Sequence, residues 1–189
     1  NVGYQHFNAM GTLADTDFFE LFFYGLWRVL PMIIVSYVVG LGIEFAAAQI
    51  RGHEINEGFL VSGLLIPMIM PINAPLWMVG VSTAFAVIIG KEIFGGTGMN
   101  IWNPALLARA FFFFSYPSMI SGDKVWIAGM PDGFSQATPL AEAAQGLPTT
   151  YDMSSMFWGL IPGSVGETST FCILLGAILL IATGIGSWK

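Results

Sequence analysis

The sequence is short of charge. Only 10% of its 189 residues are Asp, Glu, Lys or Arg and 55% are hydrophobic, whereas about a quarter of a typical soluble domain is charged. So few charges cannot cover the surface of a soluble fold of this size. With a mean hydropathy of +0.72, the composition predicts a polytopic membrane protein. Six Lys and Arg against twelve Asp and Glu also exclude a phosphate-binding surface for nucleic acid.

Cysteine is nearly absent as well. Cys172 is the single cysteine and lies in an apolar run, so this chain alone cannot form a disulfide, a zinc cluster or an iron–sulfur site. Metal or redox chemistry must therefore rely on oxygen ligands or on a bound organic cofactor. The chain begins at Asn1 with neither an initiator Met nor the basic region of a signal peptide, and we expect it to be a piece of a longer protein.

Long charge-free stretches predict where the chain crosses a membrane, because a spanning helix needs about 20 apolar residues. We expect an all-α polytopic membrane protein in which residues 1–189 are a fragment of a single membrane domain. The expected helical segments are 22–49, 59–70, 76–94, 104–120 and 171–188. Residues 1–17 are expected to form a loop, and the polar residues 121–156 are expected to form an extramembrane loop.

The interval 58–90 carries no charge but is interrupted by prolines. The prolines are Pro67, Pro71 and Pro75. Each one removes a backbone donor and clashes with the preceding turn, which predicts a half-helix over 59–70, a break at 71–75 and a full helix over 76–94. Broken helices are tolerated at membrane depth only where protein or a water-filled cavity covers the freed backbone. The broken segment either lines a binding site, as in transporters, or is a plain kinked span.

Ionisable groups in apolar segments are costly, so each predicts a function or a charged partner. Glu44 lies near the end of the first apolar segment. It is either a cation ligand or part of a proton path, or an interfacial side chain paired with Arg51. The adjoining residues 51–57 hold one histidine and two glutamates, but not in the His-Glu-x-x-His order of a zinc site, and we interpret them as a solvated loop.

A glycine-rich turn over residues 94–100 follows Lys91 and Glu92. No Gly-Lys-Ser/Thr follows the glycines and no strand precedes them, so the turn is neither a Walker loop nor a dinucleotide fingerprint, and NADH binding has no support. Glycine backbone lets a planar ligand approach closely, and the amides of Asn100 and Asn103 can hydrogen-bond the edge of a flavin or a sugar. The alternative is a tight turn capped by Asn.

Residues 132–138, Asp-Gly-Phe-Ser-Gln-Ala-Thr, resemble the flavinylation motif Asp-Gly-x-Ser-Gly-Ala-Thr of a known family. This family comprises the B-type subunit of the Na+-translocating NADH:quinone reductase and its relative, the D-type subunit of the Rnf complex. Gln136 replaces the second glycine of the motif, as in Rnf-type relatives. Further segments match in the family's order: 52–59, 90–98, 103–106 and 162–169. The resemblance therefore covers nearly the whole chain.

The resemblance implies a membrane redox subunit that carries covalent FMN and passes electrons through riboflavin to quinone, coupled to Na+ movement. Thr138 would hold FMN through a phosphoester, with Ser135 in the same cofactor-binding motif. Asn100 and Asn103 match riboflavin contacts, and Glu44 matches an acidic residue linked to sodium uptake. The quinone pocket maps to Gly40, Glu57, Gly58, Phe59, Phe111 and Phe113.

The same resemblance implies the architecture and the partners. The family has an inverted-repeat helical fold like that of urea transporters, crosses the bacterial inner membrane several times, and works with reductase subunits of the Nqr A, C, D, E and F types. Quinone, Na+ and membrane lipid are the remaining partners. Lacking a nicotinamide fold, this chain alone should not oxidise NADH. Two alternatives stay open: an Rnf-type subunit of a ferredoxin:NAD+ oxidoreductase, and a passive urea-transporter-like channel or permease.

Overall fold

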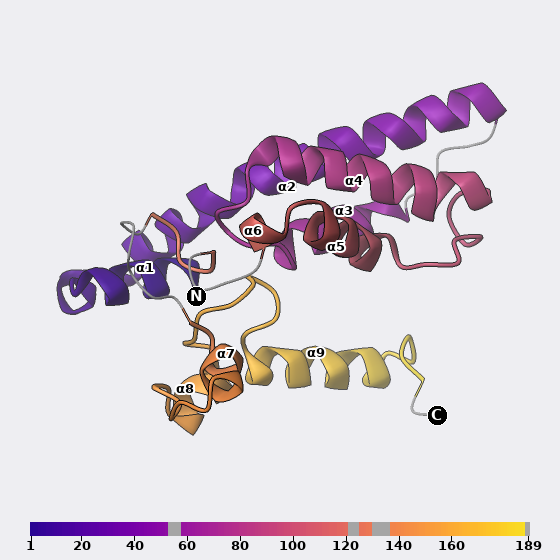
Figure 1. Ribbon diagram of the computed structural model, residues 1–189. Helices are drawn as coiled ribbons and strands as arrows, with labels where there is room; N and C mark the ends of the chain where they lie inside the picture. Colours follow the sequence, from indigo (N-terminus) through magenta and orange to yellow (C-terminus); the bar gives the residue numbers. More distant parts are fainter. Residues whose placement is uncertain (53–57, 121–124, 130–136, 188–189) are drawn as a thin grey trace.

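The computed structural model describes residues 1–52, 58–120, 125–129 and 137–187 (Figure 1). Every regular element in these ranges is a helix. Glu57, Ser135 and Gln136 lie outside the described residues, as does the connection 53–57, so the roles expected of them stay predictions.

The described elements follow one another in the order α1 (Val2–Met10), η1 (Leu13–Asp15), α2 (Phe18–Arg51), α3 (Phe59–Met68), α4 (Leu76–Gly90), η2 (Glu92–Phe94), α5 (Pro104–Ser115), α6 (Pro117–Ile120), α7 (Pro139–Ala144), α8 (Met153–Trp158) and α9 (Thr170–Ala182). Within the described residues, α2 and the run Leu76–Phe94 are long and apolar enough to cross a membrane. The loop expected over residues 1–17 is wrong, because α1 forms there and ends at Gly11, whose left-handed backbone and N–H close the helix.

Helix α2 has 34 residues and presents one narrow face to the protein. It begins at Asp17, whose carboxylate accepts a hydrogen bond from the Phe18 N–H, and it ends at Gly52 in the left-handed conformation. Its buried residues recur every three or four positions, which is the spacing of one helical face. They are Val29, Met32, Ser36, Gly40 and Glu44. The other faces expose large apolar side chains, as expected of a helix in lipid.

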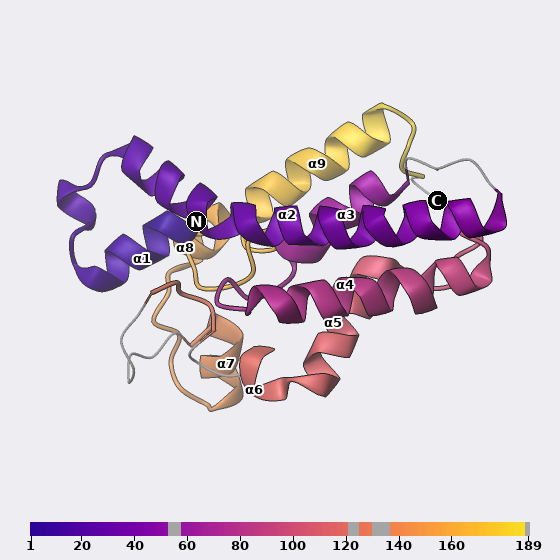
Figure 2. The same cartoon turned by 90° about the horizontal axis from the view of Figure 1, so that it is seen from above.

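The core lies between α2, α3, α4 and α5, which pack against one another (Figures 1 and 2). Its largest fully buried apolar side chains are Phe59, Phe112, Met32, Ile66, Met70, Val79 and Val87. In contrast, α9 lies apart from these helices in Figure 1 and has no buried residue. It begins at Ser169, whose hydroxyl accepts from the Cys172 N–H, and its Phe171 packs on Trp158 of α8.

The chain is not helical between the end of α3 and the start of α4, in the region where the prolines predict a break. Distant parts of the chain bind the backbone carbonyls freed there. The carbonyl of Met68 accepts from the Gly166 N–H at 2.9 Å, and the carbonyl of Ile69 accepts from the guanidinium of Arg109 on α5. The Arg109 guanidinium also pairs with Glu167 at 3.3 Å. Protein groups therefore satisfy the carbonyls that the break leaves without helical partners.

A second contact joins the same break to residues 125–129, which precede the Asp-Gly-Phe-Ser-Gln-Ala-Thr segment of the sequence. The side-chain N–H of Asn73 donates to the carbonyl of Ile127 at 2.9 Å, and Ile127 and Ala128 are buried. On its other side this segment contacts α1 and α2, since His6 bonds the Ala128 carbonyl at 2.7 Å. The break and α1 therefore both bind residues 125–129.

Helices α2 and α3 approach most closely at Gly40. A Cβ atom there would lie 1.9 Å from Cζ of Phe59, whose ring is fully buried. On the same helix, a Cβ at Gly42 would meet nothing within 4 Å. Only the first glycine is therefore required by packing.

We expect Gly40→Ala to destabilise the protein by about 1–3 kcal/mol, because a methyl group in a filled core forces its neighbours to move. Gly42→Ala is the matched control and should be neutral or slightly stabilising, since alanine favours a helix by about 1 kcal/mol over glycine. Thermal unfolding of the two purified full-length variants measures both effects. Equal unfolding temperatures for the two variants would contradict the close contact between α2 and α3.

Candidate functional site

A buried ion pair joins α2 to the end of α4. Lys91 donates from Nζ to Oε1 of Glu44, and the two side chains are only 4% and 5% exposed. The Lys91 ammonium also lies 5.8 Å from the centre of the Phe59 ring, a cation–π arrangement. Each of these charges is far costlier to bury without the other. The pair therefore fixes the register of α2 against α4.

The interfacial alternative for Glu44, a pair with Arg51, is wrong. Arg51 instead pairs with Glu92, with 3.2 Å between Nη1 and Oε2, and also donates to the Glu92 carbonyl. Arg51 lies seven residues beyond Glu44, about 10 Å along the helix, at the exposed end of α2. Glu44 faces the core and meets the lysine that follows α4.

Several polar oxygen atoms near this pair are buried without a hydrogen-bond partner among the described residues. They are Oε2 of Glu44 and the hydroxyls of Ser36 and Ser82, on α2 and α4. Ser36 lies about 12 Å along the helix from Glu44, so only Oε2 of Glu44 belongs to the pair itself. Buried polar atoms normally bond protein, water or an ion, and oxygen atoms suit hard cations. In the described part of the chain, no three His, Cys, Asp or Glu side chains gather into a metal-binding group. A cation at Glu44 would thus depend on one carboxylate and neutral oxygens.

Three residues expected at the quinone pocket lie together at the junction of α2 and α3, but in packed surroundings. Phe59 is fully buried and its ring fills the space against Gly40. Gly58 lies against Thr97 of the glycine-rich turn, where an added Cβ would be 2.4 Å from Cγ2. This junction is closed in the structure.

The two phenylalanines of the expected quinone pocket do not come together. Phe111 stacks on Phe85 of α4, with ring centres 4.3 Å apart. Phe113 is 46% exposed and borders an open pocket of about 340 Å³ together with Arg109 and Phe114. Residues two apart on a helix point to nearly opposite sides. An aromatic wall built from both rings is therefore absent from α5.

The amides expected to bind riboflavin hold the turn before α5. The side-chain oxygen of Asn103 accepts from the N–H groups of Ala105 and Leu106 at 2.9 and 3.3 Å, which is an N-cap. Asn100 donates to the carbonyl of Trp102 at 3.1 Å. The capping alternative is therefore confirmed for Asn103, although its Nδ2 has no hydrogen-bond partner among the described residues.

Thr138 is the N-cap residue of α7, within the expected extramembrane loop. Its Oγ1 accepts from the Ala141 N–H at 3.2 Å, and Pro139 occupies the first helical position. The loop then folds back on itself, because the Glu142 carboxylate accepts from both the N–H and the hydroxyl of Thr150. These bonds hold the pKa of Glu142 below its ordinary value. The half-buried Thr138 therefore lies at the start of a short helix, α7, which its own side chain caps.

The residues that sequence reasoning missed are charged partners from distant parts of the chain. Lys91 was seen only as a helix end, although a lysine directly after an apolar run indicates a need for a counter-ion. Arg109 was passed over inside the apolar segment 104–120, and Glu167 inside a polar turn. Glu167 also accepts from the Ser164 hydroxyl. The turn before α9 is therefore held by hydrogen bonds and an ion pair, and it is more than a linker.

The apolar helices, the satisfied helix break and the buried charge pair define a helical membrane protein with an interrupted span. The sequence profile of the NQR2, RnfD, RnfE family matches residues 4–189, and the chain belongs to this family.

The named relatives are B-type subunits of the Na(+)-translocating NADH-quinone reductase. The chain is 49% identical to that of Chromohalobacter salexigens over 172 residues, covering 89% of this chain and 41% of the relative. It is 44% identical to that of Pseudoalteromonas atlantica, covering 97% and 47%, and 43% identical to that of Azotobacter vinelandii, covering 99% and 48%. The chain thus spans less than half the length of these relatives. The resemblance seen in the motifs is confirmed.

We expect Lys91→Met to destabilise the protein by about 3–5 kcal/mol, because it leaves the buried Glu44 carboxylate without its counter-charge. The double variant Glu44→Gln with Lys91→Met should be more stable than Lys91→Met alone, since no unpaired charge remains. As a control, Arg51→Gln breaks a partly exposed pair and should cost only about 0.2–1 kcal/mol. Thermal unfolding of these full-length variants, and of Glu44→Gln alone to complete the cycle, measures the effects. A double variant whose loss equals the sum of the single losses would refute the coupling.

Proposed function

We propose that this chain is part of the membrane subunit of a Na+-pumping NADH:quinone reductase, located in a bacterial inner membrane. The observation that carries the proposal is its membership of the NQR2, RnfD, RnfE family together with relatives named as the B-type subunit of that reductase. In this function the chain passes electrons toward quinone, coupled to Na+ movement. Partner subunits of the Nqr A, C, D, E and F types supply NADH oxidation, because no nicotinamide-binding motif occurs in this sequence.

Thr138 is the proposed attachment site of FMN, through a phosphoester on its hydroxyl oxygen. The hydroxyl fits this use: it lies in the polar loop, is half-buried, and makes one long hydrogen bond to a backbone N–H. Bound FMN supplies the electron-carrying chemistry, while the protein sets its position. The contacts between Asn73 and Ile127, and between His6 and Ala128, keep the start of this loop close to the helices.

The riboflavin and quinone sites belong to the same proposal. Of the expected riboflavin contacts, Asn100 retains its side-chain oxygen and Asn103 its side-chain nitrogen for a ligand, since their other polar atoms are engaged. Glycine in the turn before Asn100 supports close approach of a planar ring, because Gly95 and Gly98 adopt positive φ angles. For quinone, Phe113 offers an open aromatic face, whereas access to Phe59 requires α2 and α3 to separate.

Glu44 is the proposed residue of the Na+ path. Lys91 engages one carboxylate oxygen, and the other is buried without a partner among the described residues. The second oxygen can bind a cation. Because it is buried away from water, its attraction for a positive charge is stronger than it is in solvent. The ammonium of Lys91 meanwhile supplies the counter-charge that a buried carboxylate requires.

The finer architecture is also part of the proposal. The short α3 and the break before α4 correspond to the interrupted helices of an inverted-repeat, urea-transporter-like fold. An Rnf-type subunit remains the second candidate, favoured by Gln136 in the motif, because Rnf-type relatives share this substitution. If the protein carries no bound flavin, a passive permease becomes the favoured function.

We expect Thr138→Asn to abolish covalent flavin while leaving α7 capped, because asparagine has no hydroxyl to esterify but caps a helix as well as threonine. The measurement is in-gel flavin fluorescence of the denatured full-length subunit, co-expressed with a flavin transferase. Thr138→Ala should also lose fluorescence. Thr149→Ala, an exposed threonine of the same loop, is the matched control and should keep it. Fluorescence that survives both Thr138 substitutions moves the attachment to another residue.

We expect Glu44→Gln to weaken the Na+ dependence of quinone reduction by the assembled complex, because a neutral amide is a poorer ligand for a hard cation than a carboxylate. The apparent Na+ requirement should rise about tenfold or more, with flavin content unchanged. Glu20→Gln near the start of α2 exchanges the same groups at an exposed position and serves as the control. An unchanged Na+ requirement in Glu44→Gln would leave this residue a purely structural role.

A further inference from the structure

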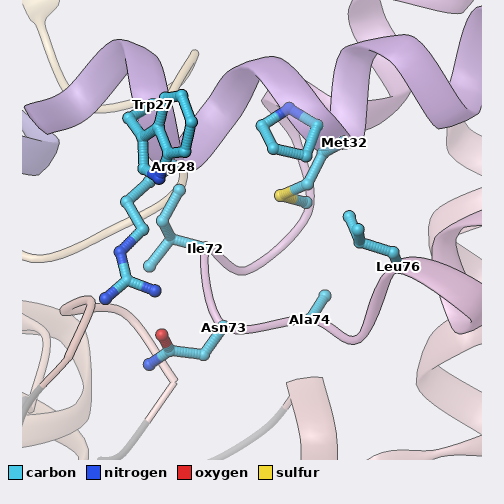
Figure 3. Close-up of a pocket in the computed structure, with 8 residues that line it drawn as sticks. Trp27, Arg28, Met32, Ile72, Asn73, Ala74 and Leu76 are labelled. Atoms are coloured by element: carbon cyan, nitrogen blue, oxygen red, sulfur yellow. The ribbon is translucent and has the colours of Figure 1, made fainter. Parts of the chain in front are cut away.

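A pocket of about 290 Å³ opens between the first half of α2 and the break before α4 (Figure 3). Its walls are Trp27, Arg28, Pro31 and Met32 from α2, and Ile72, Asn73, Ala74 and Leu76 from the break and the start of α4. Figure 3 shows the polar ends of Arg28 and Asn73 on one side of the pocket and the side chains of Met32 and Leu76 on the other. The pocket is therefore amphipathic, with its charge at one end.

Arg28 brings a positive charge that the described residues do not neutralise. Its guanidinium lies 5.6 Å from the centre of the Tyr24 ring, and it forms none of the ion pairs between described side chains. None of the residues lining the pocket is acidic. An arginine without a carboxylate partner in the part of the chain that the structure describes, beside an open cavity, is suited to a phosphate group, which its planar fork binds through paired hydrogen bonds.

The surroundings place this charge at the boundary between lipid and water. Arg28 is the last charged residue before the uncharged stretch 29–43 of α2. Next to it, Trp27 is 78% exposed, and Trp77 at the start of α4 is 58% exposed. Exposed tryptophans beside arginine are typical of the interfacial belt of membrane proteins. The pocket therefore lies at the depth of lipid headgroups.

An apolar stripe leads from the pocket along the outer face of α2. Its members repeat every three or four residues, so they share one side of the helix. They are Trp27, Leu30, Ile34, Val38, Leu41 and Phe45, all exposed. A ligand with its phosphate at Arg28 can lay a hydrocarbon chain along this stripe, which buries apolar surface on both partners.

We propose that this pocket binds the phosphate of an anionic membrane phospholipid, with Arg28 holding the headgroup and the stripe on α2 holding an acyl chain. Charge decides between lipid classes. A zwitterionic lipid would bring an ammonium group to walls that contain no carboxylate, whereas a phosphatidylglycerol-type headgroup brings only the phosphate charge and hydroxyls. The amide of Asn73 adds a polar neighbour on the headgroup side (Figure 3).

The test uses the full-length subunit in its purified complex, in phosphatidylcholine nanodiscs that contain a small fraction of a diazirine-bearing phosphatidylglycerol. After illumination, peptide mass spectrometry should locate cross-links near Trp27 and Leu76. Arg28→Gln should reduce this labelling about tenfold, the usual value of a charge-assisted hydrogen bond, and Arg28→Lys should reduce it less. Arg51→Gln is the matched control, because Glu92 already neutralises that guanidinium, and should leave the labelling unchanged.

Each arm of the experiment separates one source of the ligand from another. Equal labelling by a diazirine-bearing phosphatidylcholine would overturn the preference for an anionic lipid. Loss of labelling on addition of excess inorganic phosphate would show that the pocket binds a free anion. It would overturn the proposal that the apolar stripe on α2 holds an acyl chain. Loss of covalent flavin in Arg28→Gln would show that the pocket serves the neighbouring flavin loop instead. Labelling that Arg28→Gln does not change would remove Arg28 from the site.

Discussion

The break between α3 and α4 is the constraint on which the rest of the structure depends. Its prolines interrupt the helical hydrogen bonding, and they leave backbone carbonyls without helical partners. The protein supplies the missing donors from remote segments: Arg109 from α5 and the N–H of Gly166 from the turn before α9. The side chain of Asn73 in turn binds Ile127. Segments from the later half of the chain therefore bind the region where the helix is interrupted.

The ion pair between Glu44 and Lys91 fixes the other end of the same arrangement. Lys91 follows α4, so the pair holds α4 alongside α2 while the break holds α4 to the loop segment. Buried pairs of this kind give little net stability, because desolvation offsets most of their attraction. The proposed role of Glu44 in cation movement would give the pair a use that two apolar side chains of similar size could not supply.

Local rules predicted the parts of the fold that local chemistry decides. The prolines placed the break, and the apolar run from Phe171 indicated α9, which Ser169 caps. The pairing of Glu44 could not be read from the sequence, because its partner is 47 residues away and two basic residues were available. α1 was missed because its composition is mixed and its closing signal is the single Gly11. Helical periodicity alone could have shown that Phe111 and Phe113 diverge.

The fold, the family and the proposed function lead to one central claim, that this chain carries its redox cofactor on Thr138. Contacts of Ile127 and Ala128 hold the segment before this loop against the break and α1, and in the proposed function a tethered cofactor exchanges electrons without tight non-covalent binding. The most direct measurement is the intact mass of the native subunit from its own membrane, followed by peptide mapping. The account predicts the added mass of one phosphoester-linked FMN on the peptide containing Thr138. An unmodified Thr138 in the active complex would contradict it.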